Sequence, residues 1–359
     1  MLIIVRFRLN YAKFFTWIKM TKTFLTISLL VFLLVNTTNA QSVKVIQNEA
    51  KSRIDVEIDG KLFTSYRWEE RIKRPVLLPI MTVAGEFVTR GFPVETRNGE
   101  TIGHPHQVGS SFSYGDVNGV DFWNTSTFRT PKELERMGRI VHRKIVKIKS
   151  GKNRGELVTE SDWVLPNGKK ILIETTRFIF QAENQNRWID RETILTANDE
   201  NVVFGDNKEG LFAIHLNRQL QQNDQIKVKI TDETGNISDA KSGENLTGEY
   251  LNSEGLNGDR IWGTLGKWAS VSGKIGSEDI TVAIFDSPKN HNFPSSMMVR
   301  GYGLLALNPF GRKSFEPNSE ARNFVLEPKK SIKFRHRLLI LSVKATPEMI
   351  ENEFQKFIK

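Results

Sequence analysis

The stretch Ile54-Asp55-Val56-Glu57-Ile58-Asp59-Gly60 shows the pattern that decides the fold. Its apolar side chains occupy every second position, alternate with charged ones, and are followed by an Asp-Gly pair. Successive side chains of a strand point to opposite faces of a sheet, so this alternation predicts a strand with one buried face. Because Asp-Gly favours tight hairpin turns, the strand is expected to end in a hairpin turn.

The same pattern recurs along the chain. Ile171 and Ile173 follow the turn sequence Pro166-Asn167-Gly168. Three later runs repeat the alternation: Ile226, Val228 and Ile230; Ile280, Val282 and Ile284; and Ile332, Phe334, Leu338 and Ile340. Between 231 and 257 the chain is rich in Gly, Asn, Ser and acidic residues, which predicts a long excursion between strands. The sequence therefore predicts an all-β fold.

Two helices have clear start signals. Thr130-Pro131-Lys132-Glu133 combines a capping Thr, a Pro at the first helical position and a Glu that completes a capping box. Thr346-Pro347 opens a C-terminal segment whose apolar side chains fall on one helical face: Ile350, Phe354, Phe357 and Ile358. We expect this last helix to pack on the sheet.

The first 40 residues have the three parts of a secretory signal peptide. Phe24 to Val35 is an almost unbroken apolar run, preceded by basic residues and followed by Thr38-Asn39-Ala40. Met20 is favoured as the start, because it gives a basic region of normal length. The run is shorter than the roughly 20 residues of a membrane span. We therefore expect cleavage after Ala40 and a periplasmic or secreted single β-sandwich domain over 41–359, with no membrane span.

Composition excludes several classes of partner and chemistry. The formal charge of +10 falls to +5 without residues 1–40, which hold five basic residues and no acidic ones. No block of Lys and Arg is interleaved with aromatics, so no nucleic-acid partner is expected. The absence of Cys excludes disulfides, thiolate metal sites, a Cys nucleophile and a lipoprotein anchor. The chain also lacks a phosphate-binding glycine loop, a nucleophile elbow and a His-Glu-x-x-His helix.

The segment Gly103-His104-Pro105-His106-Gln107 is the first candidate site. If it is extended, both imidazoles project to one face, whereas Pro105 favours an edge or a loop. Contact with a polar ligand is the favoured role. A metal site needs a third ligand that this part of the sequence does not supply, and structural hydrogen bonding is the other alternative.

The segment Gly115 to Trp123 predicts a turn that presents Asp116, Asn118 and Asp121. For Asp116 and Asn118 the favoured interpretation is that their side chains stabilise the turn by hydrogen bonds. Trp123 and Trp188 are candidate platforms for stacking against a sugar, although a buried Trp is the more frequent case.

Further candidates lie later in the chain. Glu209 and His215 share a predicted strand face with Leu211 and Ala213, so a carboxylate of raised pKa could act as general acid or base; the alternative is a solvated charge. His291 lies in the loop that begins at Asp286.

Two more residues, Arg300 and His336, are expected to lie in the site and in the core, respectively. Arg300, in Arg300-Gly301-Tyr302-Gly303, could bind a carboxylate or orient an acid. His336 is in phase with the apolar positions of its strand, which indicates a core histidine outside the site.

Several of these motifs together resemble the bacterial PmoA family. The motifs are Arg90-Gly91-Phe92-Pro93, His104-Pro105-His106-Gln107, Gly115 to Trp123, Lys208-Glu209-Gly210, and Arg300 through Asn308-Pro309-Phe310-Gly311. The resemblance covers nearly the whole mature chain and implies a supersandwich similar to that of galactose mutarotases. Members commonly have Asp and His where Gly103 and Gln107 stand here. The family carries the label "methane oxygenase". Because the mature chain has no predicted membrane span, we do not predict methane oxidation for this protein.

The predicted function is an exported carbohydrate-active protein that needs no cofactor, as an isomerase, hydrolase or lyase. The predicted catalytic residues are His104, His106, Glu209 and His291. The predicted ligand-binding residues, for a small molecule or an oligosaccharide, are Arg90, Gln107, Asn118, Asp121, Trp123, His215 and Arg300. One alternative is a metal site of His104 and His106 with His291 or Glu209. Another is a non-catalytic carbohydrate-binding module, which the substituted flanks favour.

Overall fold

The structure, a computed structural model, describes residues 40–223, 227–240 and 245–359. Gln41–Lys359 form one compact unit. The predicted signal peptide lies outside the described residues except for Ala40, so it stays a prediction. No helix in the described part of the chain is long and apolar enough to cross a membrane.

The first of two large sheets has nine antiparallel strands. In spatial order they are β19 (Ser296–Met297), β20 (Leu304–Asn308), β13 (Gly210–His215), β6 (Ser110–Tyr114), β4 (Val76–Ile80), β3 (Lys61–Arg67), β2 (Arg53–Ile58), β1 (Ser42–Asn48) and β8 (Gly151–Lys152). The stretch from Ile54 to Gly60 forms β2 and its turn, as predicted. Ile54, Val56 and Ile58 are buried, and Asp59 and Gly60 adopt the positive φ angles of a tight hairpin turn into β3.

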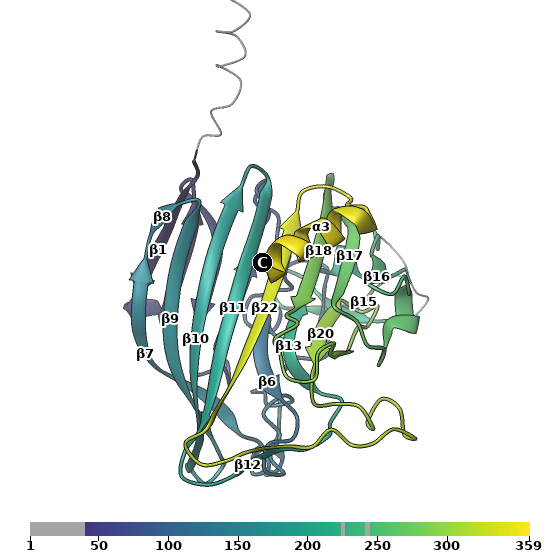
Figure 1. The fold of residues 1–359 in the computed structure, drawn as a ribbon. Helices are drawn as coiled ribbons and strands as arrows, with labels where there is room; N and C mark the ends of the chain where they lie inside the picture. Colours follow the sequence, from purple (N-terminus) through teal and green to yellow (C-terminus); the bar gives the residue numbers. More distant parts are fainter. Residues whose placement is uncertain (1–39, 224–226, 241–244) are drawn as a thin grey trace, which may run out of the picture. The chain divides into compact units, whose positions relative to one another are not determined.

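The second large sheet has eight antiparallel strands and runs across Figure 1. In spatial order they are β16 (Glu249–Asn252), β17 (Trp268–Ile275), β18 (Glu278–Asp286), β22 (Ser331–Leu341), β11 (Asn186–Ala197), β10 (Lys170–Glu183), β9 (Arg154–Val164) and β7 (Arg139–Lys149). The predicted strands around Ile280 and Phe334 are β18 and β22. In β10 the register shifts between Lys170 and Leu172, so Leu172 is buried and Ile173 only half-buried, which departs from the predicted alternation.

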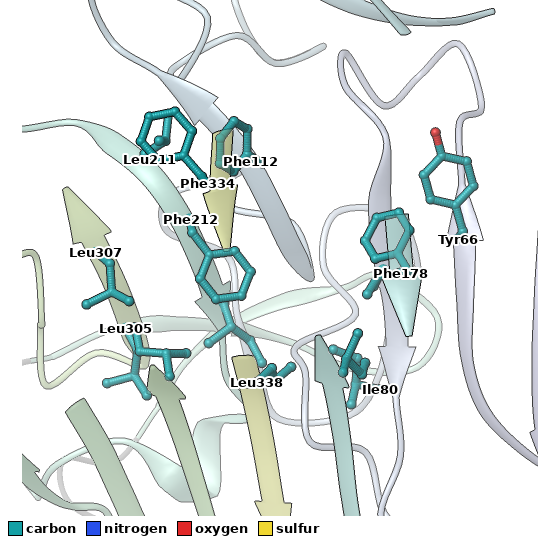
Figure 2. Packing of buried hydrophobic residues seen from close by; sticks show 14 of the residues in the cluster. Tyr66, Ile80, Phe112, Phe178, Leu211, Phe212, Leu305, Leu307, Phe334 and Leu338 are labelled. Atoms are coloured by element: carbon teal, nitrogen blue, oxygen red, sulfur yellow. The ribbon is translucent and has the colours of Figure 1, made fainter. Parts of the chain in front are cut away.

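The main core lies between the two large sheets. Figure 2 shows Phe112 and Phe212, from β6 and β13, close to Phe334 and Leu338 of β22. These four side chains are at most 2% exposed and belong to one apolar cluster with residues of both sheets. Face-to-face packing of two antiparallel sheets defines a β-sandwich. The predicted all-β class and sandwich architecture are therefore confirmed.

Two small sheets and a set of short connections complete the fold. Their strands are β12 (Val202–Phe204) with β21 (Phe324–Leu326), and β15 (Ile237–Asp239) with β14 (Lys229–Thr231) and β5 (Glu100–Thr101). Of the strand predicted around Ile226, only Lys229–Thr231 is a strand, and Ile226 itself lies outside the described residues. The predicted excursion between 231 and 257 contains β15 and β16, so it is not strandless. Strand β15 has no apolar periodicity because all three of its residues are exposed.

The two predicted helices are present. Helix α2 (Pro131–Leu134) is a single turn with the expected capping box between Thr130 and Glu133. Helix α3 (Pro347–Ile358) lies by β17, β18 and β22, as Figure 1 shows. It buries Ile350, Phe354 and Phe357 in an apolar cluster with side chains of these strands. The short 3-10 helices are η1 (Glu49–Lys51), η2 (Arg218–Leu220) and η3 (Gly258–Ile261). The prediction that the C-terminal helix packs on the sheet is confirmed.

Candidate functional site

A cleft of about 930 Å³ lies over the β13 and β20 side of the nine-stranded sheet. Its lining comes from the loop after β5, from both ends of β13, from the η2 and η3 regions, and from the loop between β19 and β20. Ala213 of β13 packs with Trp123, away from the main core, while Phe212 and Ile214 point into that core. The cleft therefore occupies the sheet face opposite the sandwich core.

Many of the predicted site residues line this one cleft although they are far apart in sequence. They are Arg90, His104, His106, Gln107, Glu209, His215 and Arg300. Glu209 precedes β13 and His215 ends it. The strand alternation predicted between them fails at Leu211, which belongs to the main core. Gly210 is the reason, because its φ of 144° interrupts the regular strand, and a Cβ there would lie 2.3 Å from the Tyr114 ring.

The His-Pro-His segment forms a turn and is not extended. The Gln107 N–H donates to the His104 carbonyl oxygen over 3.0 Å, and His104 has a φ of 52°. The two imidazole centroids are 6.0 Å apart, and the His104 ring stacks on Tyr302 at 4.3 Å between centroids. Pro105 therefore marks a loop, as expected, and the turn still directs both imidazoles to the cleft.

Arg90 holds this segment from inside the protein. Its side chain is buried and donates to four backbone carbonyl oxygens: those of Thr101 (3.0 Å), Gly103 (2.5 Å), His104 (2.9 Å) and Gln107 (3.1 Å). Both terminal nitrogens have acceptors, so Arg90 supports the turn. It also lines the cleft, and its predicted contact with a ligand stays a prediction.

A second buried arginine, Arg74, holds the same segment from the other side. Its guanidinium donates to the His106 carbonyl oxygen, to the carbonyl oxygens of Phe122 (2.6 Å) and Trp123 (2.7 Å), and to Ser113 Oγ (2.9 Å). Arg74 is not among the residues predicted from the sequence, because one Arg among many carries no local signal. Arg74 and Arg90 both bring positive charge close to the imidazoles without a hydrogen-bonded carboxylate.

A chain of hydrogen bonds joins His215 to Tyr302 through Gln107. His215 Nδ1 lies 2.8 Å from Gln107 Oε1, and Gln107 Nε2 donates to Tyr302 Oη over 3.3 Å. The amide oxygen only accepts, so the proton of a neutral His215 is on Nδ1. His215 Nε2 and Trp123 Nε1 have no partner among the described residues and line a cavity of about 10 Å³ beneath the cleft. That volume holds about one water molecule.

The three imidazoles of the cleft are electrically neutral. Burial, and then the charge of Arg74, lower the pKa of His106 to about 3. Burial and Arg90 also lower the pKa of His104, and the pKa of the fully buried His215 lies well below its usual value for the same reasons. Near neutral pH these rings can donate and accept hydrogen bonds without carrying charge.

The depressed pKa of His106 predicts a loss of stability in acid. An unfolded histidine binds its proton near pH 6.5, whereas folded His106 does so only near pH 3, so protons favour the unfolded chain between these values. The stabilisation is complete above about pH 6.5 and disappears as the pH falls. When the pH falls from 7 to 5, the free energy of unfolding of the wild type should therefore decrease by about 2 kcal/mol more than that of His106→Gln, as urea titrations can measure. Equal losses in both proteins would contradict a buried neutral His106.

Glu209 is the carboxyl group that faces the cleft beside these rings. Burial, followed by the negative charge of Asp121, raises its pKa, although Lys208 and Arg300 act in the opposite direction. Its carboxylate has no hydrogen bond or ion pair to any residue that the structure describes. A half-buried carboxyl group with a raised pKa and no protein partner is suited to exchange a proton with a ligand.

The other predicted residues lie outside the cleft lining or have structural partners. Asn118 Oδ1 accepts from Val203 N over 2.7 Å, and Asp121 Oδ1 accepts from Trp123 N and Asn124 N over 2.8 and 2.9 Å. Asp116 Oδ1 also accepts from Gly119 N over 2.9 Å. Asp116 and Asp121 therefore bond to the backbone of their own turn, whereas the bond of Asn118 links the turn to the strand at Val203.

The three remaining aromatic candidates also lie elsewhere. Trp123 is 2% exposed beneath the cleft, and Trp188 packs in the cluster of α3. His291 packs on Phe324, with 4.5 Å between ring centroids. His336 is buried and stacks on Phe212 as the predicted core histidine.

The cleft also contains residues that were not predicted as site residues from the sequence. Tyr302 stacks on His104, Trp262 lies beneath the Arg300 guanidinium at 3.5 Å, and Lys208 lines the rim. Tyr302 belongs to the motif Arg300-Gly301-Tyr302-Gly303. An aromatic residue so close to Arg300 could have been predicted to lie in the same site. Within the described residues, no group of three or more His, Asp or Glu side chains is arranged to hold a metal ion. His291, one third ligand considered for a metal, is not part of the cleft lining.

Comparison with known proteins finds similar solved structures at low identity. The galactosidase domain of the alpha-galactosidase–sucrose kinase AgaSK is 8% identical with a TM-score of 0.41, over 83% of this chain and 42% of that one. The galactose mutarotase related enzyme from Lactobacillus acidophilus is 10% identical with a TM-score of 0.29, over 84% and 98%. A galactose mutarotase-like protein from Clostridium acetobutylicum is 9% identical with a TM-score of 0.31, over 85% and 99%.

These likenesses concern the fold, and no residue role is taken from them. The chain spans less than half the length of the AgaSK chain that it matches. No curated protein sequence matches this chain. A family model described as "Family of unknown function (DUF6807)" matches residues 53–355. Because that match extends over most of the chain, this protein belongs to the family of unknown function DUF6807.

Proposed function

We propose that the protein binds a saccharide in the 930 Å³ cleft and that Glu209 performs acid–base chemistry on it with His104, since a pKa of about 3 makes the His106 imidazole a weak base. The observation that carries this proposal is the convergence of neutral imidazoles, a carboxyl group of raised pKa and two aromatic rings on one cavity. Each kind of group contributes differently to the recognition of a sugar.

The size and polarity of the cleft suit a ligand of one or a few sugar units. Pockets for small molecules have volumes of roughly 300 to 1,000 Å³, and this cleft lies near the upper end of that range. Sugar hydroxyls need both donors and acceptors, which neutral imidazoles supply. The Tyr302 and Trp262 rings supply apolar faces against which the C–H groups of a sugar can stack.

The acid–base step uses the proton of Glu209. A raised pKa keeps this carboxyl group partly protonated nearer to neutral pH than an exposed glutamate. It can then donate a proton to a sugar oxygen, and a neutral imidazole can accept one from a hydroxyl. An isomerase, a hydrolase or a lyase of saccharides would each use such a pair.

The proposal includes export to the periplasm or the outside of the cell. The apolar run from Phe24 to Val35 and the small residues up to Ala40 support it, as they are typical of a signal peptide. The resemblance of the motifs to the PmoA family stays a prediction beside the DUF6807 membership. Methane oxidation is not part of the proposal.

A non-catalytic binding module is the second candidate, favoured by the contacts of Gln107. The resemblance expects a histidine at this position, whereas Gln107 uses both ends of its amide to hold His215 and Tyr302. An amide does not exchange protons as an imidazole does. A cleft arranged in this way can recognise a sugar without turning it over.

A saccharide panel separates these candidates. Ligand at about 100 times its Kd should raise the free energy of unfolding by about 2.7 kcal/mol, which a thermal shift detects. Chromatography of the same mixtures then shows whether a product forms. Stabilisation with product supports the enzyme, and stabilisation without product supports the module. No stabilisation by any saccharide in the panel would contradict both.

Substitution of Trp262 tests whether this cleft is the binding site. Trp262→Ala should weaken saccharide binding by about tenfold in calorimetric titrations, because a stacking face and the support beneath Arg300 are lost together. Trp68→Ala is the matched control, since Trp68 stacks on His142 away from the cleft lining. Equal affinity of Trp262→Ala and wild type would place the saccharide elsewhere.

A further inference from the structure

We infer that the saccharide carries a carboxylate, as in a hexuronic acid, and that Arg300 binds this carboxylate with support from Lys208. The inference rests on the proposed saccharide function and names the ligand class that the cleft selects. It is carried by the fixed position of Arg300, by its lack of an acceptor within the described part of the chain and by the charge of the cleft.

Arg300 is held in place by its surroundings. Its backbone closes a turn with Leu304, whose carbonyl oxygen accepts from Arg300 N over 2.9 Å. Its guanidinium carbon lies 3.5 Å from the centroid of the Trp262 ring. That ring packs against Phe315 with 5.1 Å between centroids and nearly perpendicular planes. A guanidinium stacked on a supported aromatic ring loses little further freedom when it binds a ligand.

This fixed guanidinium has no acceptor among the residues that the structure describes. It donates no hydrogen bond and forms no ion pair to any residue within the described ranges, although it is half-buried. Other poorly exposed arginines have acceptors: Arg191 pairs with Glu174 at 2.6 Å and Arg337 with Asp190 at 2.5 Å, and Arg90 donates to backbone carbonyl oxygens. Since a guanidinium removed from water usually has a charged or carbonyl acceptor, the acceptor of Arg300 is expected to come from the ligand.

The charges around the cleft favour an anionic ligand. Its lining includes the cations Lys208, Arg218, Lys229 and Arg300 against the carboxyl groups of Glu209 and Asp259. Lys208 also lacks a hydrogen bond or ion pair with the described residues, and it directly precedes Glu209. Glu209 and Arg300 are close enough to influence each other electrostatically but form no ion pair, which leaves room for a ligand group between them.

The planar fork of Arg300 matches a carboxylate in particular. A guanidinium and a carboxylate form two parallel hydrogen bonds, and the pair is about twice as strong as a neutral contact. The exposed ammonium of Lys208 adds a charge without fixed geometry. A hexuronic acid offers such a carboxylate together with hydroxyls for the imidazoles and a ring face for Tyr302.

The test is calorimetric titration of the whole protein with matched saccharides. The probes are galacturonate and glucuronate oligosaccharides, their carboxyl-reduced neutral counterparts, and glucose 6-phosphate. The wild type should bind a uronate at least about tenfold more tightly than its neutral counterpart. Arg300→Gln should weaken uronate binding by about 10- to 100-fold and change neutral binding by less than about threefold. Lys208→Gln should weaken uronate binding by about threefold.

The control and the outcomes separate this inference from the proposed function. Arg143→Gln, on an exposed side chain of β7, should bind every probe as the wild type does. Equal binding of uronate and neutral saccharides, unchanged in Arg300→Gln, would overturn the carboxylate site and leave the saccharide function standing. Tighter binding of glucose 6-phosphate than of any uronate would also overturn it. If no saccharide binds while thermal unfolding shows a folded protein, the proposed function fails and the inference falls with it.

Discussion

Arg90→Met is expected to lower the free energy of unfolding by about 3 to 5 kcal/mol and to abolish ligand binding in the cleft. The wild-type guanidinium donates to the carbonyl oxygens of Thr101, Gly103, His104 and Gln107. Methionine has a similar length and no donor, so the oxygens of Thr101 and Gln107 lose their partner in a buried place and those of Gly103 and His104 in a partly buried one. The loss exceeds that of an ordinary surface change, because buried acceptors without a donor keep their full cost of desolvation.

Urea titration of Arg90→Met and wild type measures this difference. The matched control is Arg143→Met, whose side chain is 57% exposed and pairs with Asp162, so it should cost less than about 1 kcal/mol. A loss below about 1 kcal/mol in Arg90→Met would mean that water or a shifted turn supplies the missing donors. In that case the assignment of Arg90 as the support of the His-Pro-His turn would be wrong.

Glu209→Gln is expected to reduce kcat/KM by about 10²- to 10⁴-fold on whichever saccharide the panel identifies as a substrate. The amide keeps the shape of the side chain and removes the exchangeable proton. Folding should be unaffected, because the Glu209 carboxylate makes no hydrogen bond or ion pair within the described part of the chain. Product formation followed over a pH series gives the rate constants, and in the wild type the rate should fall on the alkaline side as the proton donor Glu209 ionises, at a higher pH than for an exposed glutamate.

The control for this variant is Glu183→Gln, at the exposed end of β10. It should retain the wild-type rate. Turnover by Glu209→Gln at the wild-type rate would remove Glu209 from the acid–base assignment. Binding without turnover in the wild type itself would favour the non-catalytic module, and Glu209→Gln would then change affinity only.

The strands were predictable from sequence wherever one face of the strand meets water. Ile54, Val56 and Ile58 alternate with charged residues because β2 buries a single face. The strand β18 was also predicted, but the burial of its second face was not. All residues from Ile280 to Asp286 are buried, since one face meets the sandwich core and the other meets α3. The shift in β10 at Lys170 was not predictable, because a bulge changes the phase of the side chains without changing the composition.

Several residues of the candidate site could be predicted from the sequence, but their arrangement in space could not. His104, His106, Glu209 and Arg300 were selected as polar groups beside glycines and turns, and all of them line the cleft. His291 was selected on the same grounds and packs on Phe324 elsewhere.

Arg74 was missed for a physical reason. Its function depends on carbonyl oxygens 32 to 49 positions later in the chain, with which it shares no local pattern. Pairings of this kind depend on tertiary packing.

The sequence by itself determined the all-β class, the hairpin at Asp59-Gly60, the two capped helices and the polar character of the His-Pro-His segment. These features depend on neighbours within a few positions, where periodicity and turn chemistry act. Only the tertiary structure decided that Arg90 supports the turn, that Gln107 links His215 to Tyr302, and that Arg300 faces the cleft on Trp262. Burial and the charges brought close by folding set the protonation and the partners of each group, and no local stretch of sequence encodes them.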